Sequence, residues 1–380
     1  MGDAYIVGAV RTPIGTRKGG LAAVHPADLG ARVLTELVHR TDVDPTAIDD
    51  VIMGCVNAMG PQSGCIARTA WLSAGLPESV PGVTIDRQCG SSQQAIHFAA
   101  QAVLSGTADL VVAAGVENMA LVPINANTVM LDHLQVSKYG AGWAARYGDQ
   151  EISQFRGAQL IAERWGFSRA DLEQFSLASH QRALNAIEQG VFAAETVPLE
   201  GVTTDEGPRH DTSLERMAAM EPLRPGWLLT AAVASQLSIG AAALLVASGG
   251  AVRTHHLTPI ARVHALAAVG DDPVLMLTGP IPATQRVLSR AGLTIDDIDT
   301  FEVNEAFASV VLAWAKETGA PLDRTNVNGG AIALGHPLGA TGAVLATKLI
   351  YELHRTGRRY GLQSMCEGGG QANATIFERM

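Results

Sequence analysis

The sequence is poor in charged and aromatic residues and has no excess of basic ones. Over 380 residues, charged side chains make up 17% and aromatic ones 5%, whereas hydrophobic residues make up 47%. Such a composition is typical of a well-packed folded protein and excludes a disordered or fibrous chain. Lysine and arginine number 27 against 37 aspartates and glutamates, which gives a formal net charge of −10. This balance argues against nucleic acid and against an anionic membrane as the main partner.

Cysteine is also scarce, with only Cys55, Cys65, Cys89 and Cys366 present. Their spacing matches no metal-ligand pattern, and four are too few for a disulfide scaffold in a chain of this length. We therefore expect no metal site and reduced thiols in a cytoplasmic protein, with Cys55 and Cys65 as packing residues.

Long apolar runs and nucleotide-binding glycine motifs are missing as well. The N-terminus lacks the basic region and long apolar core of a signal peptide. The longest apolar run, "IGAAALLVASGGAV" at 239–252, is too short and too rich in glycine to span a bilayer. No Rossmann glycine pattern or Walker loop is evident, so we expect neither nicotinamide nor nucleotide hydrolysis.

What the chain does contain is an internal repeat. "AIDDVIMGCVN" (47–57) resembles "TIDDIDTFEVN" (294–304), with matching residues 247 positions apart. Each copy then reaches a glycine-bearing turn and an alanine-rich helix, and the same offset aligns Cys89 with His336. Strands alternating with helices predict α/β layers with largely parallel sheets. A duplicated fold would place equivalent turns at one interface, where Cys89 and His336 could meet.

Residues 120–235 interrupt the first copy. They contain two helix-like stretches joined at "GFSRAD", where Ser168 is a candidate N-cap with Asp171 three residues later. We interpret this segment as an inserted helical loop domain that covers a site built by the core. The expected organisation is a first half of residues 1–119 plus 236–256, the insertion at 120–235, and a second half at 257–380.

Four segments carry residues suited to chemistry. Taken singly, a cysteine is most often a packing residue, a histidine a hydrogen-bonded structural residue, and a glycine run a turn. A cysteine at a strand-to-helix turn can also be a nucleophile whose thiolate is stabilised by helix N–H groups. The segments are "TIDRQCGSSQQAI" with Cys89, "VNEAFASVV" with Asn304 and Glu305, "NGGAIALGHPLGATGA" with His336, and "SMCEGGGQAN" with Cys366.

Together these segments resemble the thiolases, the coenzyme-A-dependent enzymes that make or cleave 3-ketoacyl thioesters. The resemblance covers essentially the whole chain, from "VRTPIG" to the C-terminal glycine run, and the order of "NEAFA", "GGAIALGHPLGATG" and C-x-G-G-G is specific. It implies the thiolase fold, in which duplicated five-layer α/β/α/β/α halves carry an inserted helical loop domain. It also implies a homodimer or homotetramer.

The resemblance assigns roles to the four segments. Cys89 corresponds to the nucleophile that takes the acyl group, and His336 to the base that accepts its proton. Cys366 corresponds to a second acid or base that moves a proton at Cα of the acyl-CoA. A thiol suits this task because its unperturbed pKa of about 8.5 can be tuned toward neutrality.

Two sites for negatively charged oxygens are implied in the same way. One would use His336 and a water molecule held by Asn304, and the other the backbone N–H groups of Cys89 and Gly368. Coenzyme A is the implied cosubstrate, with no permanently bound cofactor. Arg209 in "GPRHDTSLERM" matches a coenzyme-binding arginine of the family, and Ser235 in "AVASQLS" matches a serine that contacts the pantetheine arm.

The chain departs from the family pattern at two places. Many thiolases read N-x-S-Q-x-S-D-G where this chain reads "VASQLSIG", so Val233 replaces Asn, and Ile239 replaces an Asp that we expect to cap a following helix. Ser153 and Gln154 stand where short-chain biosynthetic thiolases carry a His-Met pair that lines the acyl pocket. The whole sequence looks most like thiolases of bacterial steroid and lipid breakdown, which favours a bulky or unusual 3-ketoacyl-CoA.

Three alternatives to a degradative thiolase remain open at this point. The first is a biosynthetic acetoacetyl-CoA thiolase. The second is a condensing ketoacyl carrier-protein synthase of the same fold, although the second cysteine in "CEGGG" and the "NEAF" element favour thiolase. The third is a non-catalytic acyl-CoA or sterol carrier built on this scaffold, which has no need of Cys89, His336, Cys366 and Asn304.

Overall fold

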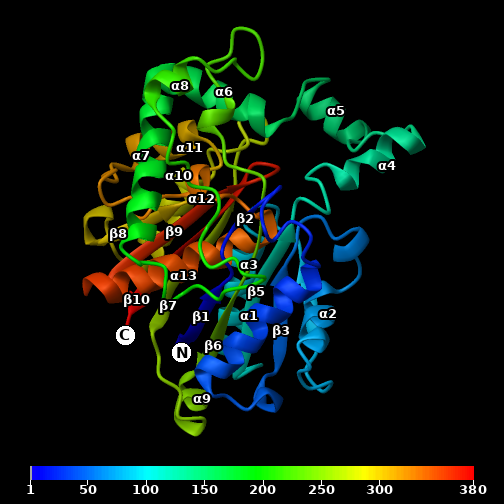
Figure 1. Cartoon of the computed structure of the whole chain (residues 1–380), viewed down its shortest axis with the longest axis vertical. Helices are drawn as coiled ribbons and strands as arrows, with labels where there is room; N and C mark the ends of the chain where they lie inside the picture. Colours follow the sequence, from blue (N-terminus) through cyan, green and yellow to red (C-terminus); the bar gives the residue numbers. More distant parts are fainter. Residues whose placement is uncertain (1) are drawn as a thin grey trace.

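The computed structural model describes residues 2–380 and shows one mixed sheet with helices on both of its faces (Figure 1). Up to the insertion, the elements are β1 (Ala4–Arg11), β2 (Gly15–Thr16), α1 (Pro26–Thr41), η1 (Pro45–Ala47), β3 (Asp50–Gly54), η2 (Gly60–Gln62), α2 (Ile66–Ser73), β4 (Gly82–Ile85), α3 (Ser91–Ser105) and β5 (Leu110–Asn118). The insertion holds α4 (Ala126–Leu134), α5 (Ala141–Tyr147), α6 (Gln154–Trp165), α7 (Arg169–Glu188), α8 (Leu214–Ala218) and η3 (Ala231–Val233).

The remaining elements complete the first set of strands and build a second one. They are β6 (Ser238–Ser248), α9 (Gly249–Thr254), β7 (Ala261–Gly270), α10 (Pro280–Ala291), η4 (Ile295–Asp297), β8 (Thr300–Val303), α11 (Ala308–Thr318), α12 (Ala331–Leu334), α13 (Leu338–Thr356), β9 (Tyr360–Glu367) and β10 (Gln371–Arg379). None of the helices among residues 2–380 has both the length and the apolar character needed to cross a membrane.

The strands run in the order β4-β3-β5-β6-β1-β7-β10-β9-β8, with β2 paired to β6. Only two residue pairs join β1 to β7, so the path divides there into two half-sheets. The expectation of largely parallel sheets is wrong. Only β3–β4, β3–β5 and β8–β9 are parallel, and the other pairs are antiparallel. The second half-sheet explains why: β9 and β10 follow one another without the crossover helix that parallel neighbours require.

The two half-sheets have the same internal design, as expected for a duplication. Asp49 accepts hydrogen bonds from the backbone N–H groups at 109 and 110, and Asp299 accepts the same pair from 359 and 360. These equivalent contacts lie 250 residues apart, so the ungapped offset of 247 is wrong for the strands. The offset of 247 does hold where α3 and α13 begin, at Ser91 and Leu338. The second copy is therefore three residues shorter between strand and helix.

Three separate apolar clusters define five layers. One cluster joins α1 and α2 to the first half-sheet, and another joins α10 and α11 to the second. The third cluster contains α3 and α13 together with strands of both half-sheets, so these two helices form the middle layer. In Figure 1, α13 crosses the body of the molecule near α3. This order of helix, sheet, helix, sheet and helix agrees with the predicted five-layer architecture.

The local sequence correctly predicts the start of α7 but not the structure of the segment at 240–248. Ser168 and Asp171 form the predicted capping box at the start of α7, with Ser168 N–H donating to the Asp171 carboxylate at 2.8 Å. The segment at 240–248 is not a helix, so the expected cap at Ile239 is wrong. Ile239 is fully buried at the start of β6, where it pairs with Asn118 and Gly15. A run buried on both faces suits a central strand, whatever its alanine content.

Candidate active site

Cys89 lies in a tight turn between β4 and the first residue of α3, as the sequence predicted. Gln88, directly before it, has φ of 49°, a left-handed conformation that is uncommon for residues other than glycine and is found at functional turns. Asp86 holds the turn by accepting the Gln88 N–H at 2.6 Å. The Cys89 side chain is 9% exposed. The turn therefore presents a nearly buried thiol at the N-terminus of a helix.

His336 lies between α12 and α13 with its ring held at both nitrogens. Its Nδ1 is 2.6 Å from the hydroxyl of Thr341, and that hydroxyl donates to the carbonyl of Pro337 at 2.9 Å. Because the hydroxyl proton is used in this second bond, the hydroxyl oxygen accepts from His336, and Nδ1 carries the ring proton. Nε2 is then unprotonated and faces the amide nitrogen of Asn304 at 3.4 Å. Nε2 is therefore the ring nitrogen through which His336 can accept a proton.

The "NEAF" segment follows β8 and is fixed by two buried side chains. Asn304 is buried, and its backbone N–H donates to the carbonyl of Ser364 on β9 at 3.0 Å. Its side-chain oxygen has no hydrogen-bond partner among residues 2–380. Glu305 accepts from Ser179 of α7 at 2.6 Å and from Asn326 at 2.9 Å. The site is thereby tied to the inserted segment.

Cys366 and Gly368 lie where β9 turns into β10. Cys366 is fully buried and pairs with Ala372 across this hairpin. The turn reaches the nucleophile, because a Cβ atom placed on Gly368 would lie 2.8 Å from the side-chain oxygen of Gln88. The backbone N–H groups of Gly368 and of Cys89 itself point toward the Cys89 sulfur. These are the two donors that the sequence suggested for one oxyanion site.

The crossing of α3 and α13 brings the two copies of the turn together. Ser92 Oγ accepts the backbone N–H of Ala343 at 2.9 Å. A Cβ atom on Gly342 would lie 2.2 Å from the backbone nitrogen of Gln93, so glycine is needed for this approach. The first turn of α3 thus meets the second turn of α13. Cys89 and His336, each two residues before its helix, are delivered to the same region although they are far apart in sequence.

Burial sets the resting charge of these groups. It raises the pKa of Cys89 to about 12, and Glu367 adds to the rise, while the N–H groups of Cys89 and Gly368 oppose it. Burial lowers the pKa of His336 to about 4. For Cys366, burial raises the thiol pKa, and the neighbouring Cys89 adds to this effect. The helix N-terminus alone thus does not ionise Cys89, and the resting pair is a neutral thiol and a neutral imidazole.

A buried carboxylate supports the first turn of α13. Glu117 is at the end of β5 and accepts backbone N–H groups from Val56, Asn57 and Gly339 at 2.9–3.2 Å. Burial is the main reason that its pKa is raised, and the hydrogen bonds lower it. An acceptor at a helix N-terminus satisfies N–H groups that the helix leaves free. Glu117 therefore holds α13, and with it His336, in position.

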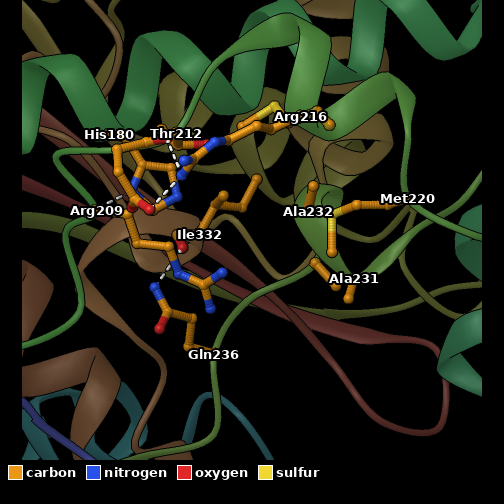
Figure 2. A pocket seen from close by; sticks show the side chains of 12 residues that line it. His180, Arg209, Thr212, Arg216, Met220, Ala231, Ala232, Gln236 and Ile332 are labelled. Atoms are coloured by element: carbon orange, nitrogen blue, oxygen red, sulfur yellow. Dashed lines mark hydrogen bonds and ion pairs between the residues drawn. The ribbon is translucent and has the colours of Figure 1, made fainter.

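A cavity of about 240 Å³ opens between the insertion and the core beside this site. In Figure 2, His180, Arg209 and Gln236 form one wall, and Met220, Ala231 and Ala232 form the opposite, apolar one. The backbone of Arg209 is held in place by its N–H group, which donates to His180 Nδ1 at 3.2 Å. Arg209 also lines a second, wider hollow that contains Ser235. Both predicted coenzyme residues thus line the same hollow.

The second hollow adds positive charge that the sequence did not single out. Arg17 and Lys18, which follow β2, line it together with Arg209 and Ser235. Ser235 donates its backbone N–H to Ala306 of the "NEAF" segment at 3.0 Å, and the carbonyl of Gln236 accepts the backbone N–H of His336 at 3.1 Å. The strand-like segment at 234–236 therefore connects the cavities to the base.

Sequence reasoning missed Thr341, Gln236 and His180. The amide nitrogen of Gln236 donates to the carbonyls of Gly207, Ile332 and Ala333 at 2.9–3.0 Å, which ties the insertion to α12, just before His336. A weak signal existed for Thr341 alone, because it lies five residues after His336 within "GHPLGATG". The other two act through contacts that no local pattern announces.

Comparison with known proteins agrees with this geometry. Residues 4–250 match the family model for the N-terminal domain of thiolase, and residues 257–379 match that for its C-terminal domain. The chain is 57% identical over 387 residues to the steroid 3-ketoacyl-CoA thiolase FadA6 of Mycobacterium tuberculosis, covering 100% of this chain and 95% of that protein. It is 43% identical to a beta-ketoadipyl-CoA thiolase of Escherichia coli, with 100% of both chains covered.

A solved structure supports the same conclusion about the fold. The crystal structure of human mitochondrial 3-ketoacyl-CoA thiolase in complex with CoA superposes with a TM-score of 0.91 at 33% sequence identity. The match covers 100% of this chain and 98% of the human one. The predicted thiolase fold is confirmed.

Proposed function

The chain belongs to the thiolase family and is a CoA-dependent acyltransferase that cleaves 3-ketoacyl-CoA, and from this premise we propose how its own residues carry the reaction. The observation that supports the proposal most directly is the tautomer of His336. Nδ1 is protonated toward Thr341, so Nε2 is free to accept a proton. Cys89 lies in the facing turn and is the group that loses this proton.

In the first half-reaction, the Cys89 thiol gives its proton to His336 Nε2, and the sulfur attacks the 3-keto carbon. The bond between C2 and C3 of the substrate then breaks, and its electron pair stays on C2. Cys366 supplies the proton that C2 needs, so acetyl-CoA or propionyl-CoA leaves. The acyl chain remains as a thioester on Cys89, with His336 protonated and Cys366 ionised.

In the second half-reaction, the thiol of free coenzyme A gives its proton to the Cys366 thiolate and attacks the acyl-enzyme. The shortened acyl-CoA leaves, and the Cys89 thiolate takes back its proton from His336. All protons are thereby restored, and the cycle is reversible as a Claisen condensation. The neutral resting pair suits this scheme, because charge is created only when a substrate is bound.

Two oxyanion sites follow from the same geometry. The N–H groups of Cys89 and Gly368 face the Cys89 sulfur, so they also face an oxygen on the carbon that the sulfur attacks. His336 and Asn304 would form the other site, with a water molecule held by the Asn304 side-chain oxygen, which has no partner within the described chain. Each donor of this kind is worth about a hundred- to a thousandfold in rate.

We propose that residues 120–235 form a loop domain that covers the coenzyme, between halves of 1–119 plus 236–256 and 257–380. Its support is the pair of cavities that Arg209 separates. The guanidinium would bind a phosphate of coenzyme A, and Ser235 would contact the pantetheine arm as it passes toward His336. Arg17 and Lys18 add charge suited to the same phosphates.

The acyl substrate that we propose is bulky or oxygenated. Ser153 and Gln154 begin α6 and are only half-buried. The next residue, Phe155, packs edge-to-face on Phe307 of the "NEAF" segment with ring centroids 5.5 Å apart, which places the start of α6 beside the site. The name of the mycobacterial relative supports a steroid-derived chain, and the names of several other relatives support a dicarboxylic one.

We propose a homodimer or a dimer of dimers as the working assembly. β4 ends the strand path and leaves one edge unpaired within the described chain, and Val83 on it is 41% exposed. Phe98 and Leu104 of α3 are exposed nearby in sequence. The segment with α4 and α5 projects from the body in Figure 1, and it exposes further apolar side chains at Val129 and Leu134. Sedimentation velocity would determine the assembly state.

The roles of the two thiols can be tested by intact-mass measurement. Wild-type protein mixed with acetyl-CoA should gain one acetyl group, and Cys89→Ala should lose both the adduct and turnover. Cys366→Ser should keep the adduct but lose most thiolysis, because acylation by a simple acyl-CoA needs no proton at Cα. An adduct that persists in Cys89→Ala, or wild-type thiolysis in Cys366→Ser, would contradict the assignment.

A further inference from the structure

A buried carboxyl group without a defined role lies between two of the site residues. Glu367 is the last residue of β9, directly between Cys366 and Gly368, and is fully buried. Its Oε2 atom has no hydrogen-bond partner among residues 2–380. Buried carboxylates are normally paired or fully hydrogen-bonded, so an unsatisfied one requires an explanation.

Glu367 lies directly against the turn that carries the nucleophile. A Cβ atom placed on Gly90 would be 1.8 Å from Glu367 Oε1 and 2.6 Å from its Cδ. Gly90 follows Cys89 and is the N-cap of α3. On its other side, the amide nitrogen of Asn373 lies 3.1 Å from Oε1 in the orientation that satisfies both ends of that amide. The carboxyl group is thus wedged between the nucleophile turn and β10.

The charges around Glu367 do not neutralise it. Arg87 is the cation that favours its ionised form, but Arg87 donates through Nη1 to Gln371 at 3.0 Å, and no ion pair joins it to Glu367 within the described residues. Asp86, Cys89 and Cys366 are the other titratable groups that face it, and negative charge on any of them opposes its ionisation. Burial dominates and raises the pKa of Glu367 to about 8.

We propose that Glu367 is a positioning residue that controls the ionisation of Cys89: its carboxyl group, wedged against the turn that carries Cys89, opposes formation of the Cys89 thiolate once it has lost its own proton. The inference rests on the proposed role of Cys89 as the nucleophile. Glu367 acts on Cys89 rather than on His336, because it lies against Gly90, the residue that follows Cys89, and its charge adds to the rise in the pKa of Cys89, whereas burial alone lowers the pKa of His336.

This arrangement limits the enzyme at alkaline pH. An ordinary thiol becomes more nucleophilic as the pH rises, because its thiolate fraction grows. Here the carboxylate of Glu367 appears before Cys89 ionises, and its negative charge holds the thiol in its protonated form. A neutral side chain of the same shape at 367 should therefore release the thiolate, and only where the wild-type carboxyl is ionised.

The test is the pH dependence of Cys89 alkylation in the full-length protein without substrate. Wild type, Glu367→Gln and Glu367→Ala would be treated with iodoacetamide between pH 6 and 9.5, and alkylated Cys89 would be quantified by peptide mass spectrometry. Glu302→Gln serves as the matched control, since Glu302 is another buried glutamate with a pKa raised by burial, to about 7, but it pairs with Lys348 at 3.2 Å and does not perturb Cys89.

We expect all four proteins to react at similar rates at pH 6. At pH 9, Glu367→Gln and Glu367→Ala should both alkylate Cys89 about tenfold faster than wild type, equivalent to about one unit of pKa, and Glu302→Gln should not. If Glu367 only packs, Glu367→Gln and Glu367→Ala should differ from each other in the rate of Cys89 alkylation, and each should change that rate by the same factor at every pH. A ratio to wild type that does not depend on pH overturns the role of Glu367.

The same experiment distinguishes this inference from the proposed function. If acetyl-CoA protects Cys89 from alkylation, the nucleophile is correct, and a flat ratio rejects only Glu367. If Cys89 is neither protected by acetyl-CoA nor alkylated at any pH, the nucleophile is wrong and the inference falls with it.

Discussion

His336 and Thr341 form a directed hydrogen bond in which the imidazole is the donor. The distance between His336 Nδ1 and Thr341 Oγ1 is 2.6 Å, and the hydroxyl in turn donates a hydrogen bond to the carbonyl of Pro337 one turn earlier. A helix that must supply a base next to its N-terminus thus uses its own first turn to select the tautomer. This bond lies within a few residues of chain, so it forms as soon as α13 does.

Replacing Thr341 with Val should lower kcat while leaving KM almost unchanged. Valine keeps the shape but removes the acceptor, so Nδ1 loses its partner and Nε2 is no longer held unprotonated. The expected loss is about a hundredfold, the lower end of what a positioned acid or base contributes. Steady-state thiolysis would measure it. Thr341→Ser keeps the hydroxyl and should recover most of the rate, and equal losses in the two variants would contradict the tautomer argument.

Removal of Arg209 should weaken the binding of coenzyme A without slowing the acyl-transfer steps. Arg209→Ala is expected to raise KM for CoA about tenfold, equivalent to about 1.4 kcal/mol, because the guanidinium is the cation shared by both cavities. An acyl-pantetheine substrate lacks the nucleotide phosphates, so the variant should use it as well as wild type does. Arg253→Ala, on exposed α9, is the surface control. An equal loss of activity with both substrates would show that Arg209 does not act by binding the nucleotide phosphates.

Acid should destabilise the protein through its buried histidines. Burial lowers the pKa of His97 to about 3, and its Nε2 faces the hydroxyl of Thr375 at 2.8 Å. In the unfolded chain the His97 imidazole is protonated near pH 6.5, whereas in the folded chain it stays neutral down to about pH 3. The free energy of unfolding is therefore highest above pH 6.5 and decreases as the pH falls toward 3. His97→Gln should remove up to about 1.4 kcal/mol per pH unit of that slope. Urea unfolding at pH 7, 6 and 5 would show it, and identical slopes would disprove it.

We expect the wild-type acyl pocket to prefer large substrates, and we expect substitutions at the start of α6 to remove this preference. We expect kcat/KM for thiolysis to be higher with a ring-bearing or oxygenated 3-ketoacyl-CoA than with acetoacetyl-CoA, because the amide of Gln154 can hydrogen-bond a polar group on the acyl chain. The double variant Ser153→His with Gln154→Met should shift the preference toward acetoacetyl-CoA. If acetoacetyl-CoA is already the best substrate of the wild type, the pocket argument fails.

Much of the candidate site could be proposed from the sequence because its residues lie at chain turns. Cys89, Asn304, His336 and Cys366 each lie at the end of a strand or the start of a helix, where glycines and small residues mark the position. The alanine-rich segment at 240–248 was misassigned for a physical reason. Its composition favours a helix, but its place between β5 and β1 makes it a buried strand, and packing outweighs propensity.

Other features depend on contacts across the whole chain. The wedge formed by Gly90 and Glu367 joins residues of different halves, and nothing near either position in the sequence indicates it. The register of the repeat was mispredicted for a similar reason, because the second copy is three residues shorter between β8 and α13 than the first is between β3 and α3, and ungapped matching cannot detect that. Charge state is the third case, since burial rather than sequence sets the pKa values of Cys89 and His336.

The position of β6 has a consequence for the order of events during synthesis. β1 pairs with β6, from Ala4 with Ser248 onward, so during synthesis β1 has no neighbour on this side until the much later β6 has been made. His336 emerges later still. A nascent chain therefore displays Cys89 long before the base that activates it, and the pair can assemble only after residues of both halves have been made.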